Sequence, residues 1–238
     1  MPVKIEGDWP GVITLRRGWS RAVSRPWNDA VPMAHLRIVR GGADFVDGCA
    51  DTLITELGVD GVLSPPLPAS VQQMWFEAGF ESFARLRLLR RELDQVPAPD
   101  HLVTVGSDED LEEALRIDAA AFDTFWRFDA NALAEAREST ATSIIHVLRG
   151  PDGGLVGFAV TGMGQVIGYL QRVAVHPAWQ RRGIGRSLVR ASARWAKRNG
   201  ALALVLNTQA ENDPAMELYL AEGFEVMSDD LAVLVRRV

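Results

Sequence analysis

Apolar residues recur with regular periods through the C-terminal part of the chain, and each period predicts an element of secondary structure. Spacings of three and four residues predict helices, whereas short apolar or alternating runs bounded by turn residues predict strands. The predicted helices span about 111–122, 130–138, 185–198 and 213–222. The predicted strands span about 143–149, 155–161, 169–175 and 201–206, with a last one within 225–235. Helices and strands mixed in this order predict an α+β fold around one mixed sheet.

The chain divides at a segment that has no periodic apolar face. Residues 94–100 contain two prolines flanked by polar residues, a composition that disfavours helix. We therefore expect an N-terminal part over residues 1–95, a linker over 96–102 and a C-terminal domain over 103–238.

The N-terminal part repeats the end of the C-terminal pattern. When Gly61–Ser64 is laid over Val205–Thr208 without a gap, Trp75–Glu81 falls on Tyr219–Glu225. The helix predicted before this stretch and the strand predicted after it also fall in place. Such a match indicates an internal repeat, although a helix followed by Gly-Phe and a strand is also a common junction that can recur by chance.

Composition narrows the classes of protein to which the chain can belong. Its 238 residues are 47% hydrophobic and 24% charged, which is ordinary for a globular protein and excludes a mainly disordered one. The formal net charge of −6 gives no sign of a nucleic-acid partner. The single cysteine, Cys49, excludes an internal disulfide and a multi-cysteine zinc site, and we expect no metal. Without a long apolar run or an apolar leader, we expect a cytoplasmic protein with no membrane partner.

The loop Gln180–Gly185 joins a predicted strand to the helix after it. Its two glycines allow close approach of the backbone, and N–H groups at a helix N-terminus bind phosphate or pyrophosphate well. The arginines at 181, 182 and 186 can add charge-assisted contacts. Taken alone, such a loop is equally well a solvated turn, and it matches neither the dinucleotide fingerprint nor the Walker loop.

Two sequence blocks together resemble the GNAT (Gcn5-related N-acetyltransferase) superfamily. The first, Gln171–Val189, carries the family's Gln/Arg-x-x-Gly-x-Gly/Ala loop, and the second, Asn212–Phe224, carries Asn-x-x-Ala, a tyrosine and Gly-Phe. The resemblance covers residues 103–238 and implies the acyl-CoA N-acyltransferase fold, preceded by a degenerate half-GNAT repeat. Within the superfamily, the C-terminal blocks resemble bacterial ribosomal-protein alanine acetyltransferases, and the tandem layout resembles mycothiol synthase.

The resemblance implies acetyl-CoA as the co-substrate. Pantetheine would add to the edge of the third C-terminal strand as if it were another strand, and backbone amides of the loop would hold the pyrophosphate. The cofactor-binding residues implied in this way are Val173, Ala174, Val175, Arg181, Arg182, Gly183, Ile184, Gly185, Arg186 and Asn212.

Catalysis would need a proton donor for the leaving thiolate and an acceptor for the amine proton. The resemblance places Tyr219 near the thioester sulfur as the acid. Asn207 stands where the alanine acetyltransferases commonly carry a glutamate, and an asparagine cannot act as a general base. Base catalysis would then run through water held by Asn207, or through another carboxylate. The carboxylates considered are Asp118, Asp123, Asp129 and Glu211.

An aromatic cluster between the first two C-terminal helices marks the acceptor side. Phe122, Trp126 and Phe128 either form a wall for the acceptor or pack the helices together. We expect direct transfer of acetyl to a primary amine of a small molecule or, alternatively, of a protein N-terminus or lysine, by a monomer or homodimer. The competing interpretation is a non-catalytic acetyl-CoA sensor or scaffold, supported by the missing glutamate at 207.

The N-terminal repeat lacks these chemical groups. In the overlay Pro68 replaces Asn212 and Trp75 replaces Tyr219, and the segment Arg40–Asp44 lacks the loop signature. We expect this half-domain to have lost acetyl-CoA and either to pack on the C-terminal sheet or to roof the acceptor site.

Overall fold

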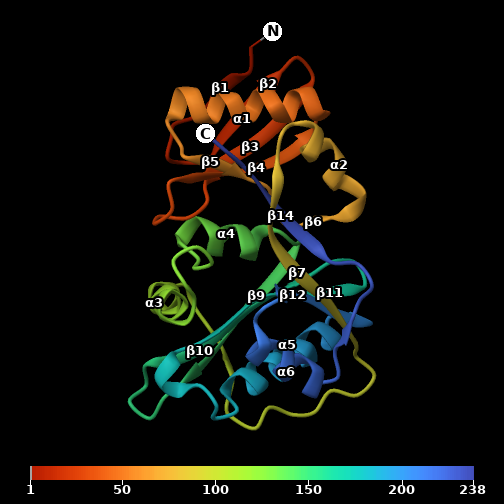
Figure 1. Ribbon diagram of the computed structural model, residues 1–238. Helices are drawn as coiled ribbons and strands as arrows, with labels where there is room; N and C mark the ends of the chain where they lie inside the picture. The colour runs from red at the N-terminus through yellow and green to blue at the C-terminus, as the bar shows by residue number, and fades with distance from the viewer. Residues whose placement is uncertain (1) are drawn as a thin grey trace. The chain divides into compact units, whose positions relative to one another are not determined.

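The computed structural model describes residues 2–238, and their contacts divide the chain into two compact units (Figure 1). Unit 1 holds the chain up to Arg87 together with Ser228–Val238, and unit 2 holds Leu88–Met227. The segment expected to be the linker, 96–102, therefore lies inside unit 2. Among the described residues, no helix is long and apolar enough to cross a membrane.

Unit 2 is a mixed sheet with helices on both faces. Its strands, in spatial order, are the end of β7 (Glu81–Glu92), β12 (Ala203–Gln209), β11 (Ile167–Val175), β10 (Leu155–Met163), β9 (Thr142–Arg149) and β8 (Thr104–Val105), with β13 (Glu225–Val226) paired to β7. Its helices are α3 (Leu111–Ala121), α4 (Ala130–Glu138), α5 (Ile184–Arg198) and α6 (Asp213–Ala221), with short 3-10 turns η1 (Asp108–Asp110) and η2 (Pro177–Trp179). All of the helices and strands expected in 103–238 are present, and their ends differ from the expected ones by a few residues.

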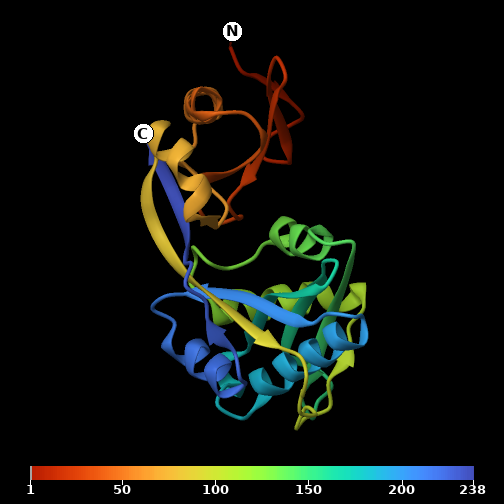
Figure 2. The ribbon, with the colours of Figure 1, turned by 90° about the vertical axis from the view of Figure 1, so that its right-hand side faces the viewer.

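The alternation of side chains along β10 builds two separate cores in unit 2. Phe158 and Val160 face α3 and α4, whereas Ala159 and Met163 face α5 and α6. Successive side chains of a strand point to opposite faces, so an almost continuously apolar strand is buried from both sides. Figure 2 shows α5 and α6 on one face of these strands and α3 and α4 on the other.

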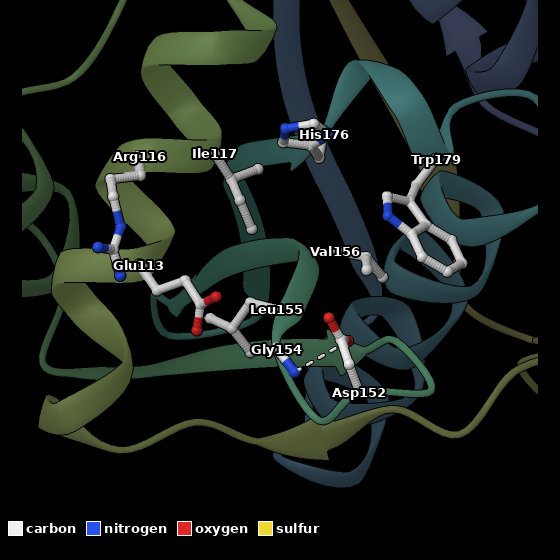
Figure 3. Close-up of a pocket in the computed structure, with 9 residues that line it drawn as sticks. All are labelled: Glu113, Arg116, Ile117, Asp152, Gly154, Leu155, Val156, His176 and Trp179. Atoms are coloured by element: carbon white, nitrogen blue, oxygen red, sulfur yellow. Dashed lines mark hydrogen bonds between the residues drawn. The ribbon is translucent and has the colours of Figure 1, made fainter.

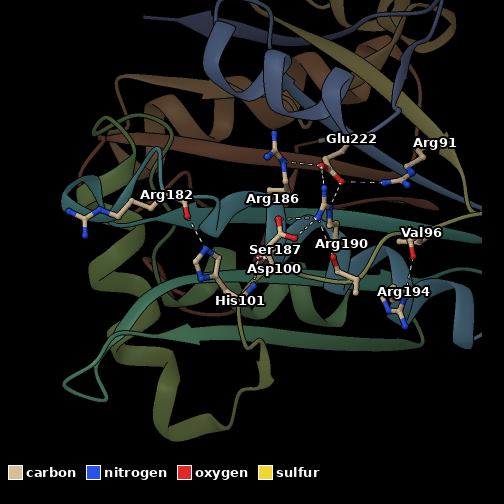
Figure 4. Close-up of polar contacts among 11 residues, drawn as sticks. Arg91, Val96, Asp100, His101, Arg182, Arg186, Ser187, Arg190, Arg194 and Glu222 are labelled. Carbon is tan, nitrogen blue, oxygen red and sulfur yellow. Dashed lines mark hydrogen bonds and ion pairs between the residues drawn. The ribbon is translucent and has the colours of Figure 1, made fainter.

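The segment that precedes β8 is held along α5 by side-chain hydrogen bonds to its backbone. Arg194 donates to the carbonyl of Val96 (Figure 4). Lys197 donates to the carbonyl of Asp94, and Arg190 donates to the carbonyl of Ala98. Prolines interrupt the N–H groups that a sheet ladder would need. Basic side chains one helical turn apart on α5 satisfy the segment's carbonyls instead.

Unit 1 repeats the second half of unit 2. Its strands, in spatial order, are β1 (Lys4–Glu6), β2 (Ile13–Arg17), β3 (Ser20–Pro26), β4 (Met33–Arg40), β5 (Gly61–Leu63), β14 (Leu231–Arg237) and the start of β7, with β6 (Leu67–Pro68) paired to β14. Its helices are α1 (Ala43–Leu57) and α2 (Ala69–Glu77). Strands β1 to β4 were not predicted, although the apolar and polar residues of Ile13–Arg16 alternate, which is the signal of a half-buried strand.

The structure confirms the internal repeat at the level of individual contacts. β4 pairs with β5 in parallel over three residues, and β11 pairs with β12 in parallel over three residues. The Trp75 and Phe80 rings meet edge to face with centroids 4.8 Å apart, and the Tyr219 and Phe224 rings do the same at 5.7 Å. The glycines between them, Gly79 and Gly223, have φ of 78° and 79°.

The strands that close the two repeats are exchanged. β14 follows α6 of unit 2 but pairs with β5 in unit 1, and β7 follows α2 of unit 1 but its end lies beside β12 in unit 2. Each unit therefore completes its sheet with a strand encoded next to the other unit's helices.

Candidate active site

Two parallel strands of unit 2 open at the position where the sequence predicts a cofactor. The pairing of β11 with β12 ends at Tyr169 and Val205, although β11 continues to Val175 and β12 to Gln209. On its other edge, Val173–Val175 remains paired with β10. Across the described residues, the β12-facing edge of 173–175 has no recorded strand partner, which leaves N–H and C=O groups able to accept an added extended chain.

The glycine loop precedes helix α5, and two of its residues have left-handed backbone conformations. Gly183 is the N-cap with φ 79°, and Arg181 has φ 62°, the only positive φ at a non-glycine among the described residues. The first intrahelical bond recorded runs from the N–H of Ser187 to the carbonyl of Gly183. The N–H groups of the first helical turn have no intrahelical acceptor, so they are able to donate to an anion at the positive end of the helix dipole.

The loop is braced from behind by the segment along α5. His101 donates from Nε2 to the carbonyl of Arg182 at 2.8 Å, and the N–H groups of Asp100 and His101 donate to Ser187 Oγ (Figure 4). The carbonyl of Arg182 therefore points to His101 and away from the N–H groups at the start of α5, which favours an anion at those N–H groups.

The three arginines of the loop differ in what they contact. Arg181 is 80% exposed and lies 3.9 Å from Glu217, and Arg182 lies over the Trp179 ring at 5.0 Å. Arg186 forms an ion pair with the buried Glu222 at 3.0 Å. The charge of Arg186 is thus already compensated, so its backbone amide, rather than its side chain, remains for a phosphate.

Tyr219 lies on α6 in the core under β11 and is 8% exposed. Burial raises the pKa of its phenol to about 12, and the nearby Arg172 opposes this only partly. No hydrogen-bond partner of its hydroxyl is recorded within 2–238. The phenol consequently keeps its proton at neutral pH and is available as a donor.

The two predicted asparagines have different environments. Asn207 is exposed on β12 beyond the point where the strands open, and it alternates with the buried Leu206 that faces α5 and α6. It therefore points to the α3 and α4 face. Asn212 is the N-cap of α6 and accepts the N–H of Ala215 at 3.3 Å, so its side-chain oxygen has a structural partner.

A buried ion pair organises the acceptor side. Arg172 binds Asp118 through two hydrogen bonds of 2.6 and 2.7 Å, with side chains 9% and 0% exposed. The guanidinium lies between the rings of Phe122 and Phe128, 3.5 and 4.0 Å from their centroids, and donates to the carbonyl of Trp126. Two of the three predicted acceptor aromatics therefore pack on Arg172.

A bulge in β11 places Arg172 at this position. Val160 of β10 faces Arg172 and Thr161 faces Leu170, so Gln171 is the extra residue. Both Gln171 and Arg172 reach the α3 and α4 face, where Gln171 donates to Ser139 Oγ at 2.7 Å. Sequence analysis missed Arg172 because an extra residue in a strand shifts the alternation on which the assignment of faces depends.

Three of the four carboxylates considered as bases have structural partners. Asp118 accepts from Arg172 and from the N–H of Phe128, and Asp123 accepts the N–H groups of Phe125 and Trp126. Asp129 caps α4 through the N–H of Ala132. These contacts give each of the three carboxylates a structural role.

A pocket of about 310 Å³ lies elsewhere in unit 2, between α3, the turn before β10 and η2 (Figure 3). It is lined by Glu113, Arg116, Ile117, Asp152, Gly154, Leu155, Val156, His176 and Trp179. Within the described chain, its lining includes no residue of β12, α6 or the 122–128 segment. This pocket is therefore distinct from the opening between β11 and β12.

The comparison with protein families agrees with this geometry. Residues 109–224 match the model of the acetyltransferase (GNAT) family. A mycothiol acetyltransferase of Nocardioides sp. is 32% identical over 187 residues, which cover 67% of this chain and 63% of that protein. An aminoglycoside N(6')-acetyltransferase type 1 of Stenotrophomonas maltophilia is 29% identical over 136 residues, which cover 51% of this chain and 89% of that protein. The chain spans 63%, 49% and 52% of the length of the first three mycothiol acetyltransferases that it matches.

Solved structures share the fold over almost the whole chain. A GCN5-related N-acetyltransferase from Sphaerobacter thermophilus superposes with a TM-score of 0.61 at 17% identity, covering 96% of this chain and 81% of its own. A tandem GNAT protein from the clavulanic acid biosynthesis pathway superposes with a TM-score of 0.61 at 15% identity, covering 95% and 82%. At these identities the likeness establishes the fold of both repeats.

Proposed function

Residues 109–224 form an acetyltransferase domain of the GNAT family, and from this premise we propose that the chain transfers an acetyl group from acetyl-CoA to a primary amine. The observation that carries the proposal is the coincidence of two features in unit 2: the open edge of β11 and the left-handed loop at the start of α5. One suits an extended pantetheine arm and the other suits a pyrophosphate. They are consecutive in the chain, so one ligand can occupy both.

The residues present fit acetyl-CoA by the chemistry of their donors. The amides of Gly183–Arg186 would hold the pyrophosphate, and Arg181 and Arg182 would add charge. Val173, Ala174 and Val175 would pair with the pantetheine amides. Asn212 would stay the cap of α6, and its amide nitrogen, which donates to Gln209 Oε1 at the end of β12, would turn to the ligand.

When bound, acetyl-CoA supplies an acyl carbon activated by its thioester, so that a new N–C bond forms as the C–S bond breaks. The backbone N–H of Val173 would donate to the carbonyl oxygen as charge develops there. Tyr219 would donate a hydrogen bond to the departing sulfur, since its pKa of about 12 keeps it protonated. A water on Asn207 would accept the amine proton.

We assign Arg172 a positioning role in this reaction. Its bidentate contact with Asp118 and its place between two phenylalanine rings fix the 122–128 segment over the bulge of β11. That segment would form the acceptor wall through Trp126. The matching relatives are named for mycothiol and for aminoglycosides, which supports a small-molecule amine as the acceptor.

The test is a calorimetric titration with acetyl-CoA of the full chain and of two loop variants. Binding of micromolar strength by the unaltered protein is expected, and Arg181→Ala with Arg182→Ala should weaken it about tenfold or more. Arg181→Gly with Arg182 intact removes one of the two charges and tolerates the positive φ at this position, so it should weaken binding less than the double variant does. A folded protein that binds no acetyl-CoA would overturn the proposal.

Turnover then separates the enzyme from a non-catalytic sensor. Acetyl-CoA consumption with small aliphatic and amino-sugar amines should release free thiol in proportion to the acetylated product. Acetyl-CoA binding without turnover on any amine would count against the enzyme and for the sensor.

A further inference from the structure

The outer face of the β1–β4 sheet in unit 1 carries a continuous row of basic side chains. Lys4 pairs with Arg16, Arg16 pairs with Arg21, and Arg21 pairs with Arg40, each across neighbouring antiparallel strands. Residues directly opposite each other in an antiparallel pair lie on the same face, about 5 Å apart. These four residues, here called the basic row, thus cross all four strands in one line, and all four are exposed.

Few carboxylates compensate the basic row. Glu6 binds Arg16 at 2.9 Å, in a pair whose side chains are 57% and 45% exposed. Arg40 donates to the carbonyl of Trp19. Within residues 2–238, no acidic partner is recorded for Lys4 or Arg21, nor for Arg37 on β4. Like charges directly opposite each other destabilise a sheet, so the arrangement has a cost that an anionic partner would remove.

The equivalent face of the unit 2 sheet carries different side chains. There Ile145, Val147, Phe158 and Val160 are apolar and covered by α3 and α4. In unit 1, α1 packs on the opposite face of these strands, and no helix of residues 2–238 is recorded in contact with the basic row (Figure 2). The face without a helix has basic side chains in place of apolar ones.

Charge in unit 1 is separated between the two faces of β1–β4. Residues 2–40 contain seven basic and three acidic side chains, a surplus of four in a chain whose net charge is −6. Helix α1 contains Asp44, Asp47, Asp51 and Glu56 and no basic residue. The local field of the sheet face, rather than the net charge, decides which ions it attracts.

An exposed aromatic ring lies at the end of the basic row. Trp19, in the turn between β2 and β3, is 85% exposed, and Arg40 lies 5.5 Å from its ring centroid. A line of cations beside an open indole is the combination that binds a sugar-phosphate backbone and a stacked base. An acidic polypeptide would use the cations but has no flat ring to place on Trp19.

We propose that the basic row and Trp19 bind single-stranded nucleic acid, with phosphates along the row and a base stacked on the indole. This function goes beyond the acetyl transfer proposed for unit 2 and does not depend on it. The net charge of −6 gave no sign of a nucleic-acid partner, because it sums the acidic side chains of α1 and the basic side chains of the sheet face.

The test is the fluorescence anisotropy of a labelled oligouridylate of about 15 nucleotides, titrated with the full chain at salt concentrations from about 50 to 200 mM. Four phosphate contacts predict a slope of log K against log salt of about −3. Arg21→Ala with Arg40→Ala should weaken binding about tenfold or more and reduce the slope by about 1.4. Trp19→Ala should weaken binding roughly fivefold or more and leave the slope unchanged.

The matched control is Arg116→Ala with Arg198→Ala, which removes the same charge from exposed positions of unit 2. It should leave binding within about twofold of the unaltered protein. Melting curves by circular dichroism establish that each variant is folded.

Four results would overturn the proposal. They are the absence of binding at low salt, an equal loss in the unit 2 control, displacement by coenzyme A, which would locate the oligonucleotide on the loop of α5, and displacement by polyglutamate of equal charge at equal concentration. The last result would identify the face as a site for acidic polypeptides.

Discussion

In both units a parallel strand pair is joined over three residues, and the units differ in the connection between the first strand and its helix. In unit 2, β11 ends at Val175 and α5 begins at Ile184, so a long loop brings two residues of positive φ to the helix N-terminus. In unit 1, β4 ends at Arg40 and α1 begins at Ala43, with Gly41 and Gly42 between them. The short parallel pairing is therefore common to both units, and in unit 2 it is followed by the loop that we propose for the pyrophosphate.

Even the glycines of the two connections serve different purposes. A Cβ at Gly41 would lie 2.4 Å from the ring of Phe45, so this glycine makes room for the core of unit 1. Asp44 lies in the first turn of α1, where a carboxylate already takes advantage of the helix dipole and would repel a phosphate. Both features are consistent with the expectation that the N-terminal repeat does not bind acetyl-CoA.

The largest effect on stability is expected at Arg172, which lies under the helices that cover one face of the unit 2 sheet. Arg172→Ala leaves Asp118 buried and uncompensated, which should lower the free energy of unfolding by about 3–5 kcal/mol. Arg21→Ala, on the exposed row of unit 1, should change it by less than about 0.5 kcal/mol. Urea denaturation of both variants measures the contrast. Equal effects would show that the ion pair does not organise unit 2.

A positioning role for Arg172 has its own signature. Arg172→Lys keeps the charge but loses the bidentate fork, so it should raise the KM for the amine more than it lowers kcat. The KM for acetyl-CoA should not change. An effect confined to stability would assign Arg172 a structural role only.

The second prediction concerns a buried imidazole in unit 2. His146 on β9 is 5% exposed, and burial, with a smaller contribution from Arg198, lowers its pKa to about 4. Between about pH 6.5 and pH 4 the unfolded chain binds a proton that the folded chain does not, so stability falls as the pH falls. The loss should reach about 3 kcal/mol at the acid end.

His146→Leu removes the proton-binding group, and the free energy of unfolding should then depend less on pH over this window. Denaturation at pH 7, 5.5 and 4.5 gives the slopes. An unchanged slope in the variant would mean that other groups cause the acid sensitivity.

Sequence reasoning went furthest where the information is local. The loop of Gly183 and Gly185 and the repeat around Tyr219 each depend on residues close together in the chain, and the structure contains both of them. What was missed depends on contacts distant in sequence. Arg172 meets Asp118 across 54 positions, and the bulge that turns it there has no local signal.

The same distinction explains the N-terminal strands. The start of β2 alternates apolar and polar residues, but the pairing of Lys4, Arg16, Arg21 and Arg40 into one row depends on register, which hairpin geometry sets. Likewise, the exchange of β7 and β14 depends on pairing between strands far apart in the chain, which the order of elements does not encode.

The third prediction compares the N-cap glycines of the two related helices. Gly183→Val places a β-branched residue at φ 79° with its Cβ 3.4 Å from His101, which should weaken acetyl-CoA binding about 100-fold. Gly42→Val at φ −110° meets no atom within 4 Å and should leave binding unchanged. Calorimetric titration of the two variants with acetyl-CoA gives the ratio of their dissociation constants. Tight binding of acetyl-CoA by a folded Gly183→Val protein would show that the loop does not hold the co-substrate.

The smallest effect is expected at the aromatic residues that correspond between the repeats. Tyr219→Phe keeps the ring and its contact with Phe224 but removes the hydroxyl, so turnover should fall about tenfold or more while acetyl-CoA affinity holds. Trp75→Phe, at the equivalent position of unit 1, should lower stability and leave kcat per folded molecule unchanged, because unit 1 has no loop to hold the co-substrate.

The pH profile separates a hydrogen-bond donor from a titrating acid at Tyr219. With a pKa of about 12, the phenol stays protonated through the assay range, so kcat should show no fall assignable to Tyr219 below about pH 10. If the profile falls at lower pH and Tyr219→Phe removes that fall, the phenol ionises in the working enzyme and the site is more polar than its burial indicates. If both repeats lose kcat equally on substitution, the half-domain takes part in the chemistry, and the division of roles between the two units is wrong.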